Sequence, residues 1–128
     1  MTRPSIDQQI TFLYTKDMEA SIRFYEQVLE LPLVLDQGGC RIYQVKDAAY
    51  IGVCFRPDAI PALSGVIFTL VVPDVDSWYD HLRKNGVPLE KAPALNDAYG
   101  IYHCFARDPS GYLIEIQRFL DNDWNMKF

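Results

Sequence analysis

The residue types best suited to chemistry lie near the end of the chain, on either side of one turn. Asp108-Pro109-Ser110-Gly111 predicts a tight turn, because Asp accepts from backbone N–H groups, Pro presets φ and Gly allows positive φ. His103 precedes this turn and Glu115 follows it. A carboxylate orients a neighbouring imidazole and stabilises its protonated form, so His103 and Glu115 are our candidate catalytic acid–base pair.

The geometry of the turn decides which side chains share a face with this pair. If Gly111 closes a five-residue loop in the left-handed conformation, the odd-numbered residues of the two flanking strands face the same side of the sheet. His103 and Phe105 are therefore expected on one face, and Glu115 and Gln117 are expected on the same face. The alternative is structural, with the imidazole satisfied in the core and the carboxylate binding backbone or tyrosine groups.

The elements that position these residues fall into two halves. In the first half, β-branched and aromatic residues predict a strand over 9–15, Asp17 suits a helix N-cap, and Pro32 ends a helix over 18–31. Three more strands are expected over residues 33–36, 41–45 and 49–55. Residues 56–65 contain two prolines and a glycine without periodicity, which predicts a linker.

The second half repeats this order. Residues 66–72 predict a strand, Asp74 suits the N-cap of a helix over 75–85, and Gly86 ends that helix. A short strand over 87–91, a loop over 91–100, strands over 101–106 and 112–118, and a tail over 120–128 complete the prediction.

The two halves can be laid over each other. Ile10 stands seven residues before Asp17, and Ile67 stands seven residues before Asp74. We therefore predict one α+β domain over residues 1–128, made of two βαβββ modules (about 8–56 and 65–119), although chance similarity of two such halves is the alternative.

The repeat, the helix start Lys-Asp-Met-Glu-Ala-Ser-Ile-Arg-Phe-Tyr and the late motif Asp-Pro-Ser-Gly-Tyr-Leu-Ile-Glu-Ile resemble the vicinal oxygen chelate superfamily. That superfamily includes glyoxalase I, extradiol dioxygenases, and the fosfomycin and bleomycin resistance proteins. The resemblance covers roughly residues 8–119 and implies paired modules whose curved mixed sheets form a half-open barrel around a cavity. It also implies a homodimer, since many members are dimeric.

The resemblance implies four metal-ligand positions, and this chain fills one of them. The two first-strand positions correspond to Ile10 and Ile67, and the strand over 49–55 offers only Tyr50 and Cys54. The last position corresponds to Glu115. Gln9 misses the first position by one residue and should point away from the cavity. A single carboxylate does not hold zinc or nickel, so we predict no metal and no other cofactor.

An apolar cavity is expected where a related enzyme would hold its metal. The predicted ligand-binding residues are Phe12, Tyr14, Thr69, Tyr99, Tyr102, His103, Phe105, Glu115 and Gln117. We predict a metal-free protein of the bleomycin resistance type that sequesters a small apolar, aromatic or cationic molecule. The alternatives are a lyase or dioxygenase with unusual metal ligands, an enzyme that uses the His103–Glu115 pair, and a packed core without a cavity.

Composition narrows the classes of partner. Hydrophobic residues make up 49% of the 128 residues and aromatic residues 13%, which favours a globular domain with rings at a pocket or an interface. The net charge of -5 without a basic cluster argues against nucleic acid and anionic membrane as partners. Without a long apolar run, a cytoplasmic location is expected, and Cys40, Cys54 and Cys104 are expected to be reduced.

Overall fold

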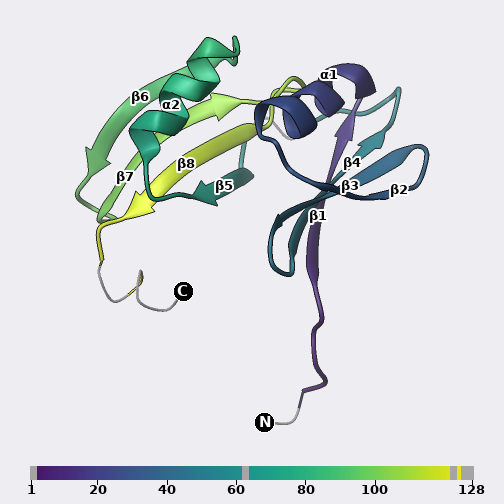
Figure 1. Ribbon diagram of the computed structural model, residues 1–128, viewed down its shortest axis with the longest axis horizontal. Coiled ribbons are helices and arrows are strands. Elements are labelled where there is room, and N and C mark those ends of the chain that lie inside the picture. The colour runs from purple at the N-terminus through teal and green to yellow at the C-terminus, as the bar shows by residue number, and fades with distance from the viewer. Residues whose placement is uncertain (1–2, 62–63, 122–123, 125–128) are drawn as a thin grey trace. The chain divides into compact units, whose positions relative to one another are not determined.

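Each half of the chain folds as one strand, a helical segment and three further strands (Figure 1). The computed structural model describes residues 3–61, 64–121 and 124, and the chain divides into two compact units, Met1–Pro61 and Ala62–Phe128. The first unit contains β1 (Gln9–Thr15), α1 (Met18–Ile22), the π-helix η1 (Arg23–Val28), β2 (Leu33–Asp36), β3 (Cys40–Lys46) and β4 (Ala49–Phe55). The second contains β5 (Ile67–Val71), α2 (Val75–Lys84), β6 (Leu89–Asn96), β7 (Ile101–Arg107) and β8 (Leu113–Phe119).

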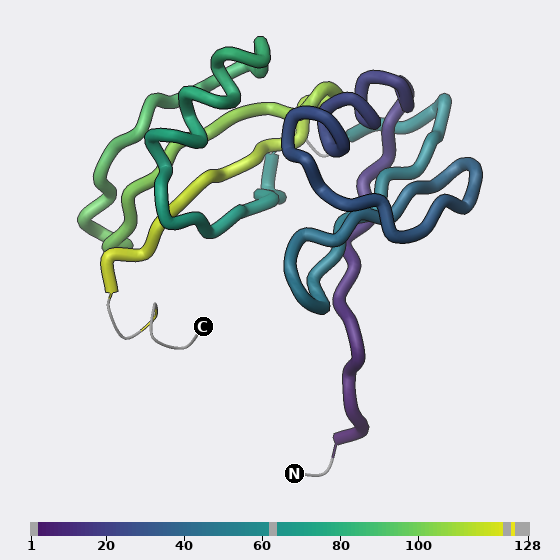
Figure 2. Tube along the Cα trace, in the orientation of Figure 1, coloured from purple at the N-terminus to yellow at the C-terminus, as the bar shows by residue number. Residues whose placement is uncertain are grey.

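The strands of each unit form a four-stranded mixed sheet with the same topology. The strand order is β1-β4-β3-β2 in the first unit and β5-β8-β7-β6 in the second, as the Cα trace in Figure 2 allows the reader to follow. β1 runs parallel to β4 and β5 runs parallel to β8, whereas the other neighbours are antiparallel. A parallel pair needs a crossover connection, which the helix and two intervening strands supply. The predicted βαβββ fold is thus confirmed.

The first helical segment departs from the prediction in its second half. Asp17 caps it as predicted, but the α-helix covers only Met18–Ile22 and is followed by a π-helix over Arg23–Val28. The Leu29 N–H donates to the Phe24 carbonyl, five residues back, at 2.9 Å. The helix predicted to residue 31 therefore ends earlier. Apolar spacing does not distinguish the two hydrogen-bond patterns, which explains the error.

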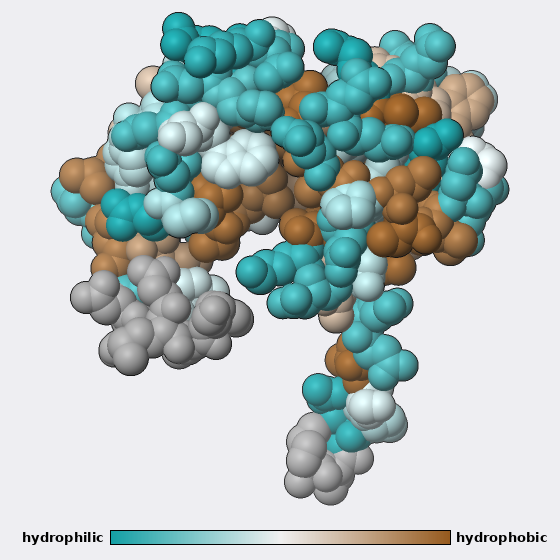
Figure 3. Space-filling view, viewed as in Figure 1, coloured by the Kyte–Doolittle hydropathy of each residue, from teal (hydrophilic) through white to brown (hydrophobic). Residues whose placement is uncertain are grey.

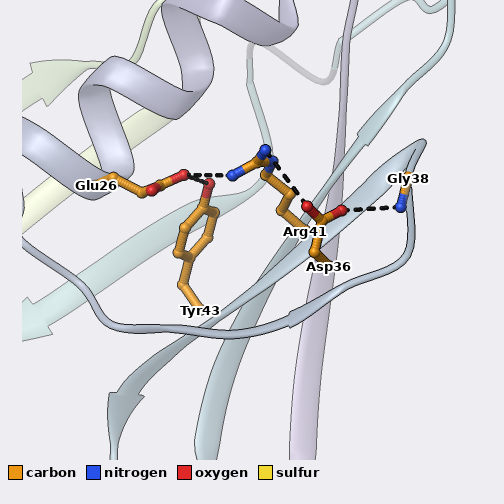
Figure 4. A network of polar contacts seen from close by, with 5 residues as sticks. All are labelled: Glu26, Asp36, Gly38, Arg41 and Tyr43. Atoms are coloured by element: carbon orange, nitrogen blue, oxygen red, sulfur yellow. Dashed lines mark hydrogen bonds and ion pairs between the residues drawn. The ribbon is translucent and has the colours of Figure 1, made fainter.

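A polar network joins this helical segment to the first sheet (Figure 4). Glu26 Oε2 accepts from the Tyr43 hydroxyl at 2.8 Å and from the Arg41 guanidinium at 3.0 Å. Arg41 also lies 3.4 Å from Asp36 Oδ2, and Asp36 Oδ1 accepts from the Gly38 N–H at 2.9 Å. Burial and the hydrogen bond to Glu26 raise the pKa of Tyr43, so its hydroxyl stays protonated and ties the helix to β3.

In the second unit, α2 covers one face of the sheet. Asp74 caps it as predicted, accepting from the Ser77 N–H at 3.0 Å and the Ser77 hydroxyl at 2.7 Å. Leu82 is fully buried beneath the helix. The Tyr102 hydroxyl of β7 donates to Asp76 of α2 at 2.6 Å. Tyr102 therefore lies on the face of β7 that α2 covers. Its neighbours along the strand, such as His103, point to the opposite, open face.

The segment expected as a loop over residues 91–100 is largely strand. β6 covers Leu89–Asn96 and pairs with β7 despite Pro93 in its sequence. The pairing changes register on both sides of Lys91, and β6 lies at the edge of its sheet. An edge strand with bulges tolerates the missing N–H of proline, so the loop prediction was wrong for residues 91–96.

Two of the three cysteines are joined. Cys40 of β3 and Cys54 of β4 lie opposite each other in register and form a disulfide, so the expectation of reduced cysteines was wrong for this pair. Strand pairing brings their Cα atoms to 4.1 Å, a proximity that the linear spacing does not reveal. Cys104 is free and buried, and burial raises the pKa of its thiol to about 11.

Two predicted segments fall partly outside the described residues. Residues 62–63 of the predicted linker and residues 122–123 and 125–128 of the tail are not described. Within the tail, the Trp124 ring lies 4.7 Å from the Phe119 ring, centroid to centroid. None of the described helices has the length and hydropathy needed to cross a membrane.

Candidate functional site

Strand register gathers most of the predicted residues on the open face of the second sheet. His103 of β7 lies opposite Gln117 of β8, and Phe105 lies opposite Glu115. Thr69 of β5 lies beside Glu115 across the parallel pair β5–β8. Directly paired residues share a face, so these five predicted residues form one cluster on the face away from α2.

The turn between β7 and β8 sets this register. Asp108 Oδ1 accepts from the Ser110 N–H and from the Tyr112 N–H, both at 2.9 Å. Gly111 adopts φ 94°, which is the left-handed conformation predicted for it. A turn longer or shorter by one residue would send Glu115 to the helix side, because strand side chains alternate.

Glu115 is the centre of the cluster. Its Oε2 lies 2.6 Å from His103 Nδ1, and its Oε1 accepts from the Thr69 hydroxyl at 3.0 Å. With the NH2 group of its amide turned to the carboxylate, Gln117 donates to the same two oxygens at 3.1 and 3.0 Å. Three donors therefore converge on one carboxylate, which acts purely as an acceptor.

The pair at the centre of this cluster is shielded from water. His103 is 4% exposed and Glu115 is 9% exposed. The Phe105 ring stands edge-on to the imidazole, with 5.0 Å between ring centroids. Among the described residues, His103 Nε2 has no hydrogen-bond partner although it is buried. Glu115 orients the ring through Nδ1, and Nε2 is left as the one unsatisfied polar atom of the cluster.

The remaining predicted residues lie elsewhere. Tyr102 does not join the cluster, because adjacent residues of a strand point to opposite faces and its hydroxyl binds Asp76. Tyr99 lies between β6 and β7 and is 77% exposed. Phe12 and Tyr14 belong to β1 in the first unit, so they contribute to the open face of the other sheet.

The open face of the first sheet is apolar. The Thr15 hydroxyl accepts from Ser21 of α1 at 2.9 Å, which puts Thr15 on the helix side. By alternation, Phe12 and Tyr14 point to the other face, where they are 49% and 43% exposed. In Figure 3 apolar (brown) atoms also gather over β2 of this unit, where exposed residues include Leu35.

Two hollows open on the first unit. One, of about 300 Å³, is lined by Gln8, Ile10, Val34, Leu35, Ile42 and Tyr50. The other, of about 430 Å³, includes Phe12 and Tyr14 together with Gln37, Phe55, Arg56 and the Cys40–Cys54 disulfide. Phe12 and Tyr14 were predicted from the sequence as ligand-binding residues, whereas Gln37, Phe55, Arg56 and the two cysteines were not. Only the pairing of β1 with β4, which sets Tyr14 beside Cys54, brings these residues together.

The donor set does not fit a bound metal. Ile10 and Ile67 occupy the first-strand positions, and neither side chain has a donor atom. Gln9 bonds to the Thr11 hydroxyl at 2.9 Å, and the β1–β4 pairing runs without a bulge, so Gln9 lies on the helix side of β1. Glu115 already accepts three hydrogen bonds. The described residues contain no group of three His, Cys, Asp or Glu able to hold a metal.

Known proteins share this fold. Residues 7–116 match the Glyoxalase/Bleomycin resistance protein/Dioxygenase superfamily. A bleomycin resistance determinant encoded on the transposon Tn5 is 23% identical with a TM-score of 0.72, over 89% of this chain and 98% of that chain. A lactoylglutathione lyase from Agrobacterium tumefaciens is 25% identical with a TM-score of 0.70, over 91% of this chain and 95% of that chain. No curated protein sequence matches the chain.

Proposed function

The chain belongs to the Glyoxalase/Bleomycin resistance protein/Dioxygenase superfamily, and within it we propose that this protein binds and sequesters a small apolar or aromatic molecule without a metal. One observation carries the proposal. Glu115, the acid at the expected ligand position, is held by Thr69, His103 and Gln117. The other expected positions on first strands are isoleucines. A carboxylate whose two oxygens already accept these hydrogen bonds is poorly placed to hold a metal, which favours a metal-free site.

Exposed apolar side chains on both open faces support an apolar ligand. Phe12 is 49% exposed on β1, and Ile67 and Val71 are 51% and 53% exposed on β5. Grouped apolar residues at a surface mark a binding site for a ligand or a partner. A small aromatic molecule would cover such side chains and remove them from water.

A thermal-shift titration with neutral aromatic probes, such as 2-naphthol, tests this proposal. A ligand that binds only the native state at 100 times its Kd stabilises it by about 2.7 kcal/mol, so Tm should rise with probe concentration. Elemental analysis of protein purified without chelator should find zinc, nickel, iron and manganese below stoichiometric amounts. A stoichiometric metal, or a Tm that no aromatic probe raises, would refute the proposal.

Acid–base catalysis by His103 is the second candidate, favoured by the 2.6 Å contact with Glu115 and by the unpartnered Nε2. In this scheme Nε2 takes a proton from a bound substrate, and Glu115 stabilises the imidazolium that forms. The shielding of both side chains from water makes this the less favoured candidate, since a substrate must reach Nε2 past the surrounding side chains.

Matched histidine variants separate binding from catalysis. His103→Ala should abolish turnover and leave ligand binding intact if Nε2 is the base, whereas loss of binding alone identifies a contact residue. His81→Ala is the control, because His81 lies on α2 and its ring packs against Trp78. Equal activity of the His103→Ala and His81→Ala proteins would exclude the catalytic role.

We also propose that the protein forms a homodimer. The support is the family itself and the exposed apolar residues of both open faces. Sedimentation velocity at micromolar concentration should give twice the mass of the 14.7 kDa chain. A monomer at all accessible concentrations would refute this assembly.

A further inference from the structure

The larger hollow of the first unit is built at one end of three strands. Phe12 and Tyr14 of β1 form one side of it. The Cys40–Cys54 disulfide joins β3 to β4 at its edge, and Phe55 ends β4 beside it. Its volume of about 430 Å³ suits a molecule of one or two rings.

The Phe12 ring, which lines this hollow, packs directly against the backbone of the sheet. A Cβ atom at Gly52 would lie 2.4 Å from Cδ1 of the Phe12 ring, so glycine allows the ring to lie directly over the backbone of β4. Phe12 and Tyr14 are nevertheless 49% and 43% exposed. Two half-exposed rings on the open face of β1 offer stacking surfaces to a flat ligand.

Arg56 gives this aromatic hollow a positive charge. It is the first residue after β4, and its N–H donates to the Thr15 carbonyl at 2.9 Å, which holds the residue at the rim. Its guanidinium carbon lies 4.7 Å from the centroid of the Tyr14 ring. Among the described residues that line the hollow, Arg56 alone is charged.

The guanidinium has no anionic partner within the described residues, where Arg56 forms no ion pair. Stacking on Tyr14 leaves the N–H groups of a planar guanidinium free in its own plane, where they match a carboxylate with two parallel hydrogen bonds. Although the net charge of the chain is -5, the charge at the rim of this hollow is positive, and charges more than a Debye length away are largely screened from it.

We infer that this hollow takes a small aromatic molecule that carries a carboxylate, with its rings against Phe12 and Tyr14 and its carboxylate at Arg56. The inference rests on the proposed binding function and specifies the chemical class of the ligand. Gln37 lines the same hollow and supplies an amide for a second polar group of the ligand.

Isothermal titration calorimetry with two probes of similar size tests the inference on the full chain at low salt. The probes are 2-naphthoate and the neutral 2-naphthalenemethanol. We expect the wild-type protein to bind 2-naphthoate about tenfold more tightly, as one charge-assisted contact provides. Arg56→Gln should remove this preference. Arg23→Gln, which loses the same charge from the exposed side of η1, should retain it.

Three results would overturn the inference while leaving the proposed function in place, provided that the neutral probe binds. These are equal affinity of the wild-type protein for both probes, an unchanged preference in Arg56→Gln, and equal loss of preference in both arginine variants. If neither probe binds any of the proteins, the proposed function fails and the inference fails with it.

Discussion

At the scale of single residues, Glu115 is the residue on which both proposed functions depend. It receives hydrogen bonds from a hydroxyl, an imidazole and an amide, all from one face of a single sheet. Such a carboxylate contributes to the stability of the protein as well as to its site, because the buried His103 and Gln117 would otherwise lose their acceptor.

Removing this carboxylate should be costly. Glu115→Ala leaves Thr69, His103 and Gln117 without their acceptor, and we expect a loss of about 3 kcal/mol in the free energy of unfolding. Urea denaturation measures the change. Glu90→Ala, which removes an exposed partner of Arg107, should cost less than about 1 kcal/mol. Equal costs for the two variants would contradict the role assigned to Glu115.

The three cysteines should be protected from thiol reagents in two different ways. Burial raises the pKa of Cys104 to about 11, so very little of its thiol is ionised at pH 8, and Cys40 and Cys54 are already paired. Native protein should therefore not react with a thiol reagent such as DTNB at pH 8. Unfolded, unreduced protein should show one thiol, and reduced protein should show all 3 cysteines. Fast labelling of native protein would exclude this arrangement.

At the scale of elements, the two helix caps were readable from the sequence because an N-cap depends on local residues only. The same locality made the 108–111 turn predictable. The π-helical end of the first helical segment and the strand β6 were not predictable in this way. The first depends on which carbonyl an N–H selects, and the second depends on pairing with β7, which compensates for Pro93.

The cap of α2 should make stability depend on pH. The hydroxyl and N–H of Ser77 lower the pKa of Asp74, so the carboxylate stabilises the fold above its unfolded pKa of about 4 and ceases to do so as the pH falls through the lower folded value. Asp74→Asn should therefore lower the urea midpoint at pH 7, and this deficit should shrink as the pH falls below about 4. Asp58→Asn, outside any helix, controls for the lost charge. A deficit that is the same at every pH would contradict this account.

The contact of β1 with β4 provides a second test at this scale. Gly52→Ala places a methyl group 2.4 Å from the Phe12 ring, so the ring or the strand must move, at a cost of about 1–3 kcal/mol. The second change Phe12→Ala should recover part of this loss, which a double-mutant cycle of urea denaturation measures. Additive losses would show that the methyl group does not displace the ring.

At the scale of the whole molecule, each unit can be understood by itself. Each has its own four-stranded sheet with a helical segment on one face and an open second face. One open face is apolar with an arginine at its rim, and the other carries the Glu115 cluster. The two copies of one topology have therefore diverged in chemistry.

Stability of the whole chain should not depend on a metal. The described residues contain no group of three donors for a metal, so an excess of EDTA should leave Tm and the far-UV circular dichroism spectrum unchanged. Protein incubated with zinc and then desalted provides the comparison. A Tm that falls with EDTA and returns with zinc would contradict the metal-free proposal.

The sequence by itself determined the order of elements, the helix caps, the turn at residues 108–111 and the shared face of His103, Phe105, Glu115 and Gln117. These features depend on contacts between residues that are close along the chain. Only the tertiary structure decided the Cys40–Cys54 disulfide and the hollow around Arg56. The disulfide depends on the register of β3 with β4, which shifts between Gln44 and Lys46, and the hollow depends on the pairing of β1 with β4, two strands that are far apart in the chain.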